Sequence, residues 1–286
     1  MNKKTSPVVL ITGAASGFGR DAAVSFAKNG FVVIAAVRRL SRANELLAEM
    51  KQKQLKEQMI LVEFDVTNHQ QVKEAIESVM IEVGSIDVLI NNAGFAFAGF
   101  AEDLTISEWR TQFETNLFGV IAVTNEILPW MREQGYGRII NMSSISGKVS
   151  YPGIAAYGSS KHALEGYSES LRLEVMPFGI DVCLLEPGSY KTKIWSSGKR
   201  VASASASPSS PYYSLFERLE RAVERRKDNF GDREEVIRTL VRVATAKRPK
   251  LRYPVGKGVK ITILAKTILP WRLWEKLVHY VLKKIE

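Results

Sequence analysis

The chain has 286 residues, of which 45% are hydrophobic and 24% charged, a balance that excludes disorder along its whole length. Its net charge of +10 arises in the last third: residues 1–190 carry 17 basic and 21 acidic side chains, whereas residues 191–286 carry 23 and 9. The acidic balance of the larger part excludes nucleic-acid binding through the main body, and the basic excess indicates a separate role for the C-terminal part.

The cysteine and histidine content narrows the class of protein further. The single cysteine, Cys183, excludes an intrachain disulfide and a cysteine-based zinc site. The three histidines have no metal-ligand spacing, so we expect no metal. No apolar run reaches the roughly 20 residues that a membrane-spanning helix needs, and the short run near the N-terminus does not make a signal peptide. We therefore expect a cytoplasmic protein.

Six short apolar runs alternate with amphipathic stretches of helix length along the first 190 residues. Runs that are apolar on both faces are typical of parallel strands covered by helices on both sides. The expected strands are residues 8–12, 31–37, 60–64, 86–90, 138–142 and 180–185, and the clearest helices are 20–29, 70–83 and 160–176. No seventh strand is evident after residue 190. This order predicts an α/β fold, a Rossmann-type doubly wound parallel sheet with helices on both faces.

We expect the whole chain, residues 1–286, to form a single domain. Its core would span about 6–195, followed by a mobile substrate loop at about 196–215 and a basic amphipathic C-terminal extension at about 250–286. The loop prediction rests on a stretch rich in serine, alanine and proline, Val201–Pro211.

The first expected strand runs into a glycine-rich turn, Thr12-Gly-Ala-Ala-Ser-Gly-Phe-Gly19. Glycines at these positions permit a tight turn and let a pyrophosphate approach the backbone. The helix that starts near Gly17 then directs free N–H groups at the phosphates. This turn therefore predicts a dinucleotide site.

The end of the second strand favours NADP(H) over NAD(H). An acid at this point would hydrogen-bond the adenosine ribose and select NAD. The chain instead has Arg38 and Arg39, whose guanidinium groups could hold a 2′-phosphate. The alternative is that both arginines are solvated surface charges, in which case NAD(H) remains open.

The residues Ser144, Tyr157 and Lys161 form a second constellation. Tyr157 and Lys161 are four residues apart, which places them on one face of a helix. A phenol with a pKa of about 10 is a poor base at neutral pH, but a nearby ammonium lowers that pKa. Tyr157 could then exchange a proton with an alcohol or carbonyl oxygen, to which Ser144 could also donate. No Ser/His/acid triad supports a hydrolase.

Together with Asn91-Asn92-Ala93-Gly94, Asn116 and Pro187-Gly188, these motifs resemble the short-chain dehydrogenase/reductase family over about the first 195 residues. The resemblance implies an oxidoreductase that interconverts a carbonyl and an alcohol by hydride transfer with a nicotinamide cofactor. The chain is most similar to the 17β-hydroxysteroid dehydrogenase-like and retinol dehydrogenase-like branch, which implies a lipophilic small-molecule substrate. The family also implies a homodimer or tetramer.

The resemblance implies a role for each matched residue. Tyr157 would be the general acid/base, Lys161 would hold the nicotinamide ribose and lower the pKa of Tyr157, Ser144 would polarise the substrate oxygen, and Asn116 would fix a water in a proton relay. The implied cofactor contacts are Gly13, Ser16, Gly17, Phe18, Gly19, Arg38, Arg39, Asp65, Val66, Asn92, Ala93, Gly94, Tyr157, Lys161, Pro187, Gly188 and Thr192.

Aromatic side chains in segments that border the expected site indicate an apolar pocket: Phe95, Phe97, Phe100, Tyr190 and Trp195. Packing in the core or in a lid explains these residues equally well. Two functions remain in competition: the NADP(H)-dependent enzyme, and a catalytically silent NADP(H)-binding regulator or scaffold.

The last residues predict a basic amphipathic helix that begins at Pro270. Its apolar positions recur at helical spacing: Trp271, Trp274, Leu277, Val278, Val281 and Leu282. Its basic positions are Arg272, Lys276, Lys283 and Lys284. Such a helix could lie on an anionic membrane surface, which would make the protein membrane-peripheral. The alternative is a helix packed across the substrate cleft or on a neighbouring subunit.

Overall fold

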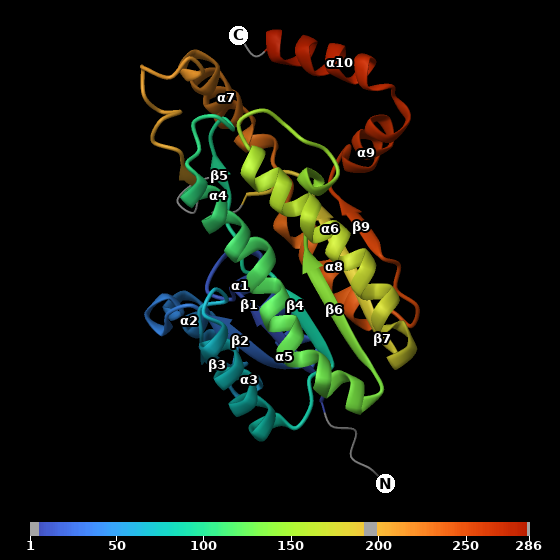
Figure 1. The fold of residues 1–286 in the computed structure, drawn as a ribbon. Coiled ribbons are helices and arrows are strands. Elements are labelled where there is room, and N and C mark those ends of the chain that lie inside the picture. Colours follow the sequence, from blue (N-terminus) through green and yellow to red (C-terminus); the bar gives the residue numbers. More distant parts are fainter. Residues whose placement is uncertain (1–5, 192–198, 285–286) are drawn as a thin grey trace.

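A sheet of seven parallel strands forms the centre of the molecule (Figure 1). The computed structural model describes residues 6–191 and 199–284. The sheet has the strand order β3-β2-β1-β4-β6-β7-β9. Its strands are β1 (Val8–Thr12), β2 (Val32–Val37), β3 (Met59–Glu63), β4 (Val88–Asn91), β6 (Gly137–Met142), β7 (Ile180–Pro187) and β9 (Arg252–Val255). Two short strands pair outside it, β5 (Phe97–Ala98) and β8 (Arg200–Val201).

Helices cover both faces of the sheet. The first face is covered by α1 (Gly17–Lys28), α2 (Asn44–Gln52) and α8 (Arg233–Thr245). The second is covered by α3 (His69–Val83), α5 (Gly119–Gln134) and α6 (Ala155–Val175). The other helices are α4 (Ile106–Phe113), α7 (Tyr213–Arg226), α9 (Val259–Ile268) and α10 (Trp271–Lys283). The predicted α/β fold is therefore confirmed.

Alternation along β1 shows why apolar runs predicted this sheet. Val9 and Ile11 pack with α1, whereas Val8 and Leu10 pack with α3 and α5. Because successive side chains of a strand point to opposite faces, a strand covered on both sides must be apolar throughout. All five residues of β1 are buried.

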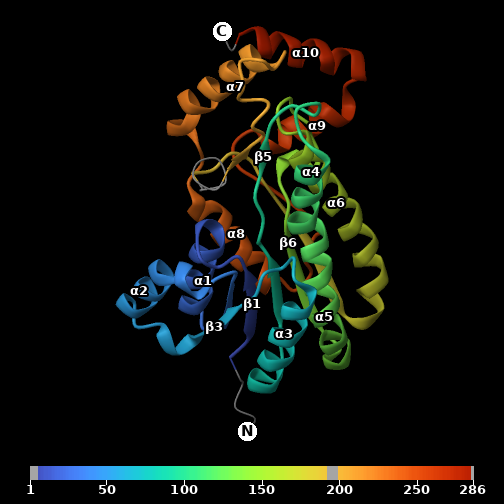
Figure 2. The same cartoon turned by 60° about the vertical axis from the view of Figure 1, so that its left-hand side comes forward.

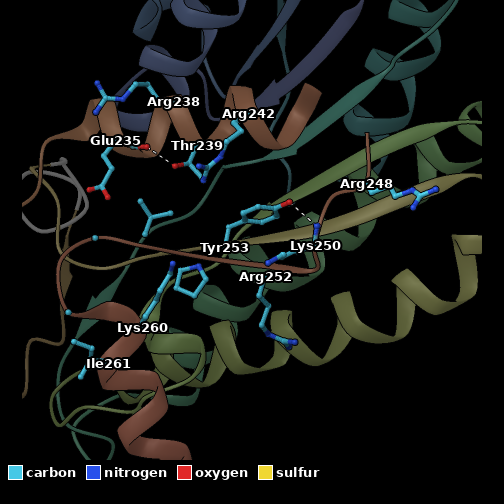
Figure 3. A pocket seen from close by; sticks show the side chains of 14 residues that line it. Glu235, Arg238, Thr239, Arg242, Arg248, Lys250, Arg252, Tyr253, Lys260 and Ile261 are labelled. Carbon is cyan, nitrogen blue, oxygen red and sulfur yellow. Dashed lines mark hydrogen bonds between the residues drawn. The ribbon is translucent and has the colours of Figure 1, made fainter. Parts of the chain in front are cut away.

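The strand β9 was not predicted, and it lies inside the segment expected to be a C-terminal extension. It pairs with β7 alone and contains Arg252 and Pro254, so it has no apolar run. Proline is tolerated there because an edge strand leaves one side unpaired. With α8 and α9, this strand borders a cavity of about 1120 Å³ (Figure 3). The core therefore does not end near residue 195.

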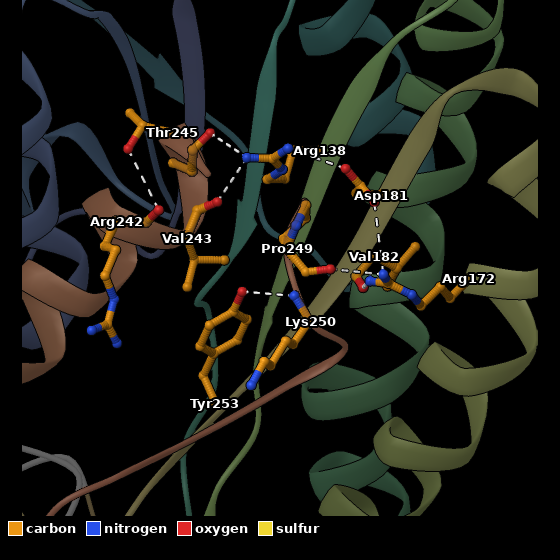
Figure 4. Close-up of polar contacts among 11 residues, drawn as sticks. Arg138, Arg172, Asp181, Val182, Arg242, Val243, Thr245, Pro249, Lys250 and Tyr253 are labelled. Carbon is orange, nitrogen blue, oxygen red and sulfur yellow. Dashed lines mark hydrogen bonds and ion pairs between the residues drawn. The ribbon is translucent and has the colours of Figure 1, made fainter. Parts of the chain in front are cut away.

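Two arginines tie the segment that leads into β9 to the rest of the sheet (Figure 4). Arg138 of β6 donates to the carbonyl oxygens of Val243, at 2.8 Å, and Ala244, at 2.7 Å. Arg172 of α6 donates to the carbonyl oxygen of Pro249 at 2.9 Å. The acceptors are backbone carbonyl oxygens, which every sequence has. No residue pattern could therefore predict these contacts.

The helices α9 and α10 lie at the end of the molecule toward which the strands run (Figures 1 and 2). The helix expected after Pro270 is present as α10, with Pro270 at its N-cap. Within residues 6–191 and 199–284, no helix is long and apolar enough to cross a membrane.

Candidate active site

The glycine turn between β1 and α1 is shaped by its contact with the end of β4. Gly13 has φ +68°, and a Cβ built on it would lie 2.9 Å from the Cα of Ala93. A Cβ on Gly19 would lie 2.4 Å from the carbonyl oxygen of Gly13. Neither position has room for a side chain, so these two glycines are required by the turn itself.

The N-terminus of α1 is open, in contrast to the packed glycines. Gly17 has φ +57°, and a Cβ built on it would meet no described atom within 4 Å. Ser16 stands at the N-cap, but its side chain makes no capping hydrogen bond with the described residues of the helix. The first turn of α1 contains no acidic residue. Its backbone N–H groups, the Ser16 hydroxyl and the helix dipole are thus free to receive an anion such as a phosphate.

Thr12 and Asn92 fasten the glycine turn to β4, a role that sequence analysis missed. The Thr12 hydroxyl accepts hydrogen bonds from the backbone N–H groups of Asn92 and Ala93, both at 3.0 Å. Asn92 Nδ2 donates to the carbonyl oxygens of Thr12, at 2.9 Å, and Gly13, at 3.2 Å. The side-chain amide of Asn92, which was expected to contact the cofactor, therefore braces the turn. Only tertiary structure reveals this pairing, because the residues lie 80 apart in the chain.

Arg38 and Arg39 follow β2 and are exposed. The backbone N–H of Ala14, in the glycine turn, donates to the carbonyl oxygen of Ala36 in β2 at 3.0 Å, so the arginines follow a strand end that adjoins the turn. Neither guanidinium forms an ion pair with a described residue. The acid that ends β3, Glu63, instead accepts the backbone N–H of Leu40 at 2.6 Å.

Asp65 and Val66 follow β3 at the same edge of the sheet. Asp65 Oδ1 accepts the backbone N–H of Thr67 at 3.0 Å and its hydroxyl at 2.8 Å, so one carboxylate oxygen closes a local turn. Val66 is buried against Gly119, where a Cβ would lie 2.8 Å from the Val66 side chain. The expected cofactor contact at these residues stays a prediction.

The structure brings Ser144, Tyr157 and Lys161 together. Ser144 follows β6 and forms a side-chain hydrogen bond with Tyr157, which lies in the first turn of α6. Lys161 is one helical turn further along, and its Nζ lies 5.9 Å from the centre of the Tyr157 ring. Tyr157 is 4% exposed and Lys161 6%. All three side chains are therefore largely withdrawn from water.

The expected lowering of the Tyr157 pKa is wrong for this structure. Burial raises the pKa of Tyr157, and the hydrogen bond from Ser144 offsets this only in part. Lys161 does not counteract burial: its Nζ lies 5.9 Å from the centre of the Tyr157 ring and donates to the carbonyl oxygen of Met142 at 2.7 Å. Burial also lowers the pKa of Lys161 to about 8, against the opposing charge of Glu165. Spacing alone could not show that burial outweighs the neighbouring charge.

Asn116 is fully buried in a π-helical turn, Glu114–Phe118, between α4 and α5. Its Oδ1 accepts the backbone N–H of Phe95 at 3.2 Å. Its Nδ2 donates to the carbonyl oxygen of Phe95 at 3.1 Å and to the hydroxyl of Ser160, the neighbour of Lys161, at 3.2 Å. Gly94 packs against this amide, since a Cβ there would lie 3.2 Å from Oδ1. Such wide turns are frequent at functional sites. The proposed water relay stays a prediction.

The C-terminal part of the chain packs against the Pro187-Gly188 segment. The backbone N–H of Gly188 donates to the carbonyl oxygen of Val255 in β9 at 2.9 Å. A Cβ on Gly188 would lie 2.8 Å from the side chain of Val259, the first residue of α9. Thr192, which was expected to contact the cofactor, lies outside the described residues.

The aromatic residues expected to line a pocket divide between separate apolar clusters. Phe95 and Phe97 meet edge to face, with ring centres 5.4 Å apart. Phe100 instead stacks on Tyr212, with ring centres 4.6 Å apart.

Tyr190 belongs to the core on the α1 and α8 side of the sheet. Its hydroxyl donates to Glu235 at 2.7 Å, and its ring meets Phe18 edge to face at 5.8 Å. The expectation of a pocket-lining Tyr190 is therefore wrong, because sequence position could not tell on which side of the strand end the ring would pack. Trp195 lies outside the described residues.

Comparisons with known proteins agree with this arrangement. A family model described as short chain dehydrogenase matches residues 7–201. The chain is 42% identical over 278 residues to the uncharacterized oxidoreductase YusZ of Bacillus subtilis, covering 97% of this chain and 98% of that one. It is 36% identical over 254 residues to a 3-ketodihydrosphingosine reductase of Bacteroides thetaiotaomicron, covering 89% of each. The crystal structure of a short-chain dehydrogenase from Streptomyces avermitilis matches all of both chains, with a TM-score of 0.81 and 29% identity.

Proposed function

The chain belongs to the short-chain dehydrogenase/reductase family, and on that premise we propose that it is an NADP(H)-dependent carbonyl reductase acting on lipophilic small molecules, with Tyr157 as general acid/base. The family predicted from the sequence is confirmed, and with it an oxidoreductase of the class that interconverts carbonyls and alcohols. The observation that carries the finer proposal is the buried cluster of Ser144, Tyr157 and Lys161 after β6, at the same edge of the parallel sheet as the glycine turn after β1.

The residues at the glycine turn fit a nicotinamide dinucleotide. The open N-terminus of α1, with Gly17 facing no described atom and the Ser16 hydroxyl uncommitted, would hold the phosphates. Exposed Arg38 and Arg39 would hold a 2′-phosphate, which supports NADP(H). When bound, this cofactor supplies or accepts the hydride, and the protein supplies orientation and the proton.

The side chains around Tyr157 favour catalysis in the direction of carbonyl reduction. A carbonyl that receives a hydride must also receive a proton, and only a protonated phenol can donate one. Because burial raises the pKa of Tyr157, its hydroxyl stays protonated at neutral pH. Ser144 would donate a second hydrogen bond to the same oxygen and stabilise the charge that develops on it. The reverse reaction needs the phenolate and is therefore favoured only at alkaline pH.

Lys161 would hold the nicotinamide ribose with its ammonium, which is anchored to the carbonyl oxygen of Met142. Since its pKa lies at about 8, this group is charged at neutral pH and loses its charge as the pH rises further. Asn116 would support it through Ser160 and keep the Phe95 backbone in place.

A lipophilic substrate is supported by the apolar side chains beside Tyr157. Phe97, Leu104, Ala156 and Ala202 form one buried cluster, against which Phe95 packs. Ala156 is the immediate neighbour of Tyr157, so this apolar cluster adjoins the proposed acid. The similarity to a protein named for the reduction of 3-ketodihydrosphingosine supports a keto group on a lipophilic chain.

The direct test uses purified full-length protein with a panel of lipophilic ketones and aldehydes, and follows nicotinamide absorbance with NADPH and NADH in parallel. We expect turnover that prefers NADPH. Turnover that prefers NADH would contradict the cofactor assignment. Tight NADPH binding without turnover across the panel would instead favour the silent regulator or scaffold. On family grounds we also propose a homodimer or tetramer, which sedimentation velocity would identify.

A further inference from the structure

The helices α9 and α10 hold an unusual share of the exposed apolar surface. Among the residues that the structure describes, 19 large hydrophobic side chains are exposed, and 8 of them lie between residues 261 and 281. They are Ile261, Leu264, Ile268, Trp271, Leu273, Leu277, Tyr280 and Val281. Single exposed apolar residues are ordinary, but a concentration of this kind marks an interaction surface.

In α9 the exposed residues form one stripe. Ile261, Leu264 and Ile268 are spaced by three and four residues, which places them on one face of the helix. They are 73%, 58% and 68% exposed. The helix is fixed at its start, because Val259 is buried against Gly188. The stripe therefore belongs to an anchored helix whose apolar side faces solvent.

In α10 the apolar face is wider than packing requires. Trp274 is buried, and Val278 and Leu282 are half-buried, so these three positions form the inward edge. The adjoining flank of the same apolar face, Leu273, Leu277, Tyr280 and Val281, stays exposed.

Basic side chains surround these stripes. The two helices and the following residue carry Lys260, Lys266, Arg272, Lys276, Lys283 and Lys284, against one acid, Glu275. That acid accepts the indole N–H of Trp271 at 2.6 Å. Lys266 Nζ lies 4.1 Å from the centre of the Trp271 ring, and Lys284 Nζ lies 4.6 Å from that of Tyr280. The basic cavity in Figure 3 adjoins α9 through Lys260 and Ile261.

We propose that α9 and α10 form a docking surface for an anionic lipid membrane. A helix with a broad apolar face, interfacial aromatics and lysines at its border is suited to the boundary between headgroups and acyl chains. Anionic headgroups would neutralise the six basic residues. A second copy of the chain fits less well, because a two-fold interface would bring the same positive charges face to face.

The surface is placed near the candidate active site. The start of α9 contacts Gly188 in the proposed cofactor segment. Both helices lie at the end of the molecule where α6 begins (Figures 1 and 2), and Tyr157 is in the first turn of α6. Docking would bring that end of the molecule toward lipid, where a lipophilic substrate is dissolved. This access to a lipophilic substrate rests on the proposed function, whereas the proposed membrane binding does not.

Co-sedimentation of the full-length protein with lipid vesicles tests the proposal without any activity readout. We expect binding to phosphatidylcholine vesicles that contain phosphatidylglycerol, weak binding to pure phosphatidylcholine, and weaker binding at high salt. Leu273→Ser with Leu277→Ser should weaken binding about tenfold for each leucine, since each apolar side chain inserted contributes roughly 1.5 kcal/mol or more. Ile81→Ser with Leu173→Ser is the matched control, because these residues on α3 and α6 are even more exposed than Leu273 and Leu277.

A second pair of variants tests the charge. Lys276→Gln with Lys283→Gln should weaken binding about fivefold for each lysine, whereas Lys73→Gln with Lys56→Gln should have no effect. Circular dichroism and NADPH turnover of each variant without vesicles separate loss of docking from loss of folding.

Two results would overturn the proposal: no binding by the unaltered chain, or equal binding to neutral vesicles. If the unaltered chain does not bind and Leu273→Ser with Leu277→Ser dissociates an oligomer in sedimentation velocity, the surface is a subunit interface instead.

Discussion

The first 190 residues and the segment from residue 199 onward contribute to the same sheet in different ways. Except for β3, which forms the opposite edge, the strands of the first part lie in the centre, buried on both faces, and most were recognisable as apolar runs. The later segment adds an edge strand, β9, and the helix α8, and it is held by arginines that bind backbone carbonyls. A central strand must consist of apolar residues, because helices cover both of its faces. An edge strand can be held by polar contacts, which leave no pattern in the sequence.

This difference extends to the candidate site. The chemical groups come from the first part, at motifs that a reader of the sequence can find. Their support comes partly from the later segment, since β9 and α9 pack on Gly188. We therefore expect substitutions in the first part to affect turnover most and substitutions in the later segment to affect stability most.

The largest effect should follow from removing the Ser144 hydroxyl. Ser144→Ala should lower turnover about 10²-fold to 10³-fold, because one preorganised donor to the reacting oxygen is lost. NADPH binding, measured by fluorescence titration, should not change. Ser146→Ala is the matched control, since that buried serine lies two residues away. Equal losses in both variants would contradict a specific role for Ser144.

In the later segment, the largest effect should be on stability. Arg252 lies 2.9 Å from Glu165 and 3.2 Å from Glu186, and it also pairs with Glu169. Arg252→Met should reduce the free energy of unfolding by about 3 kcal/mol, because it leaves the buried carboxylate of Glu165 without this partner. Urea denaturation measures this change. The exposed Arg238→Met should alter stability by less than about 0.5 kcal/mol.

A smaller effect is expected at the end of β2. Arg38→Ala with Arg39→Ala should lower the preference for NADPH over NADH about tenfold, since charge-assisted bonds to the 2′-phosphate would be lost. The ratio of kcat/KM values for the two cofactors measures this preference. Arg42→Ala, an exposed arginine nearby, should leave the ratio unchanged. If all three arginines behave alike, Arg38 and Arg39 are only surface charges.

A further effect concerns the pH dependence of stability. Burial raises the pKa of Glu186 from 4.5 to about 8, with Glu165 adding to the shift and Arg252 opposing it. A raised carboxyl pKa means that the folded state binds the proton more tightly. Stability from this group is therefore full below pH 4.5 and is lost as the pH rises toward about 8. Glu186→Gln should flatten this loss in urea denaturation measured from pH 5 to 9.

The sequence was sufficient to predict the sheet from β1 to β7, the glycine turn and the grouping of Ser144, Tyr157 and Lys161. It did not reveal β9, because a strand that contains Arg252 and Pro254 has no apolar run. It could not show the side on which Tyr190 packs. The bracing roles of Thr12 and Asn92 join residues far apart in the chain. The raised pKa of Tyr157 depends on burial, which only the folded structure determines.

The most direct test of the central claim compares two tyrosines of the same helix. Tyr157→Phe and Tyr167→Phe each remove one phenolic hydroxyl from α6, and only the first lies beside Ser144. NADPH consumption with a lipophilic ketone and NADPH binding would be measured for both variants. The account predicts that Tyr157→Phe binds NADPH normally but turns over at least about 10²-fold more slowly, while Tyr167→Phe keeps its turnover. Full turnover in Tyr157→Phe would contradict the assignment of Tyr157 as the proton donor.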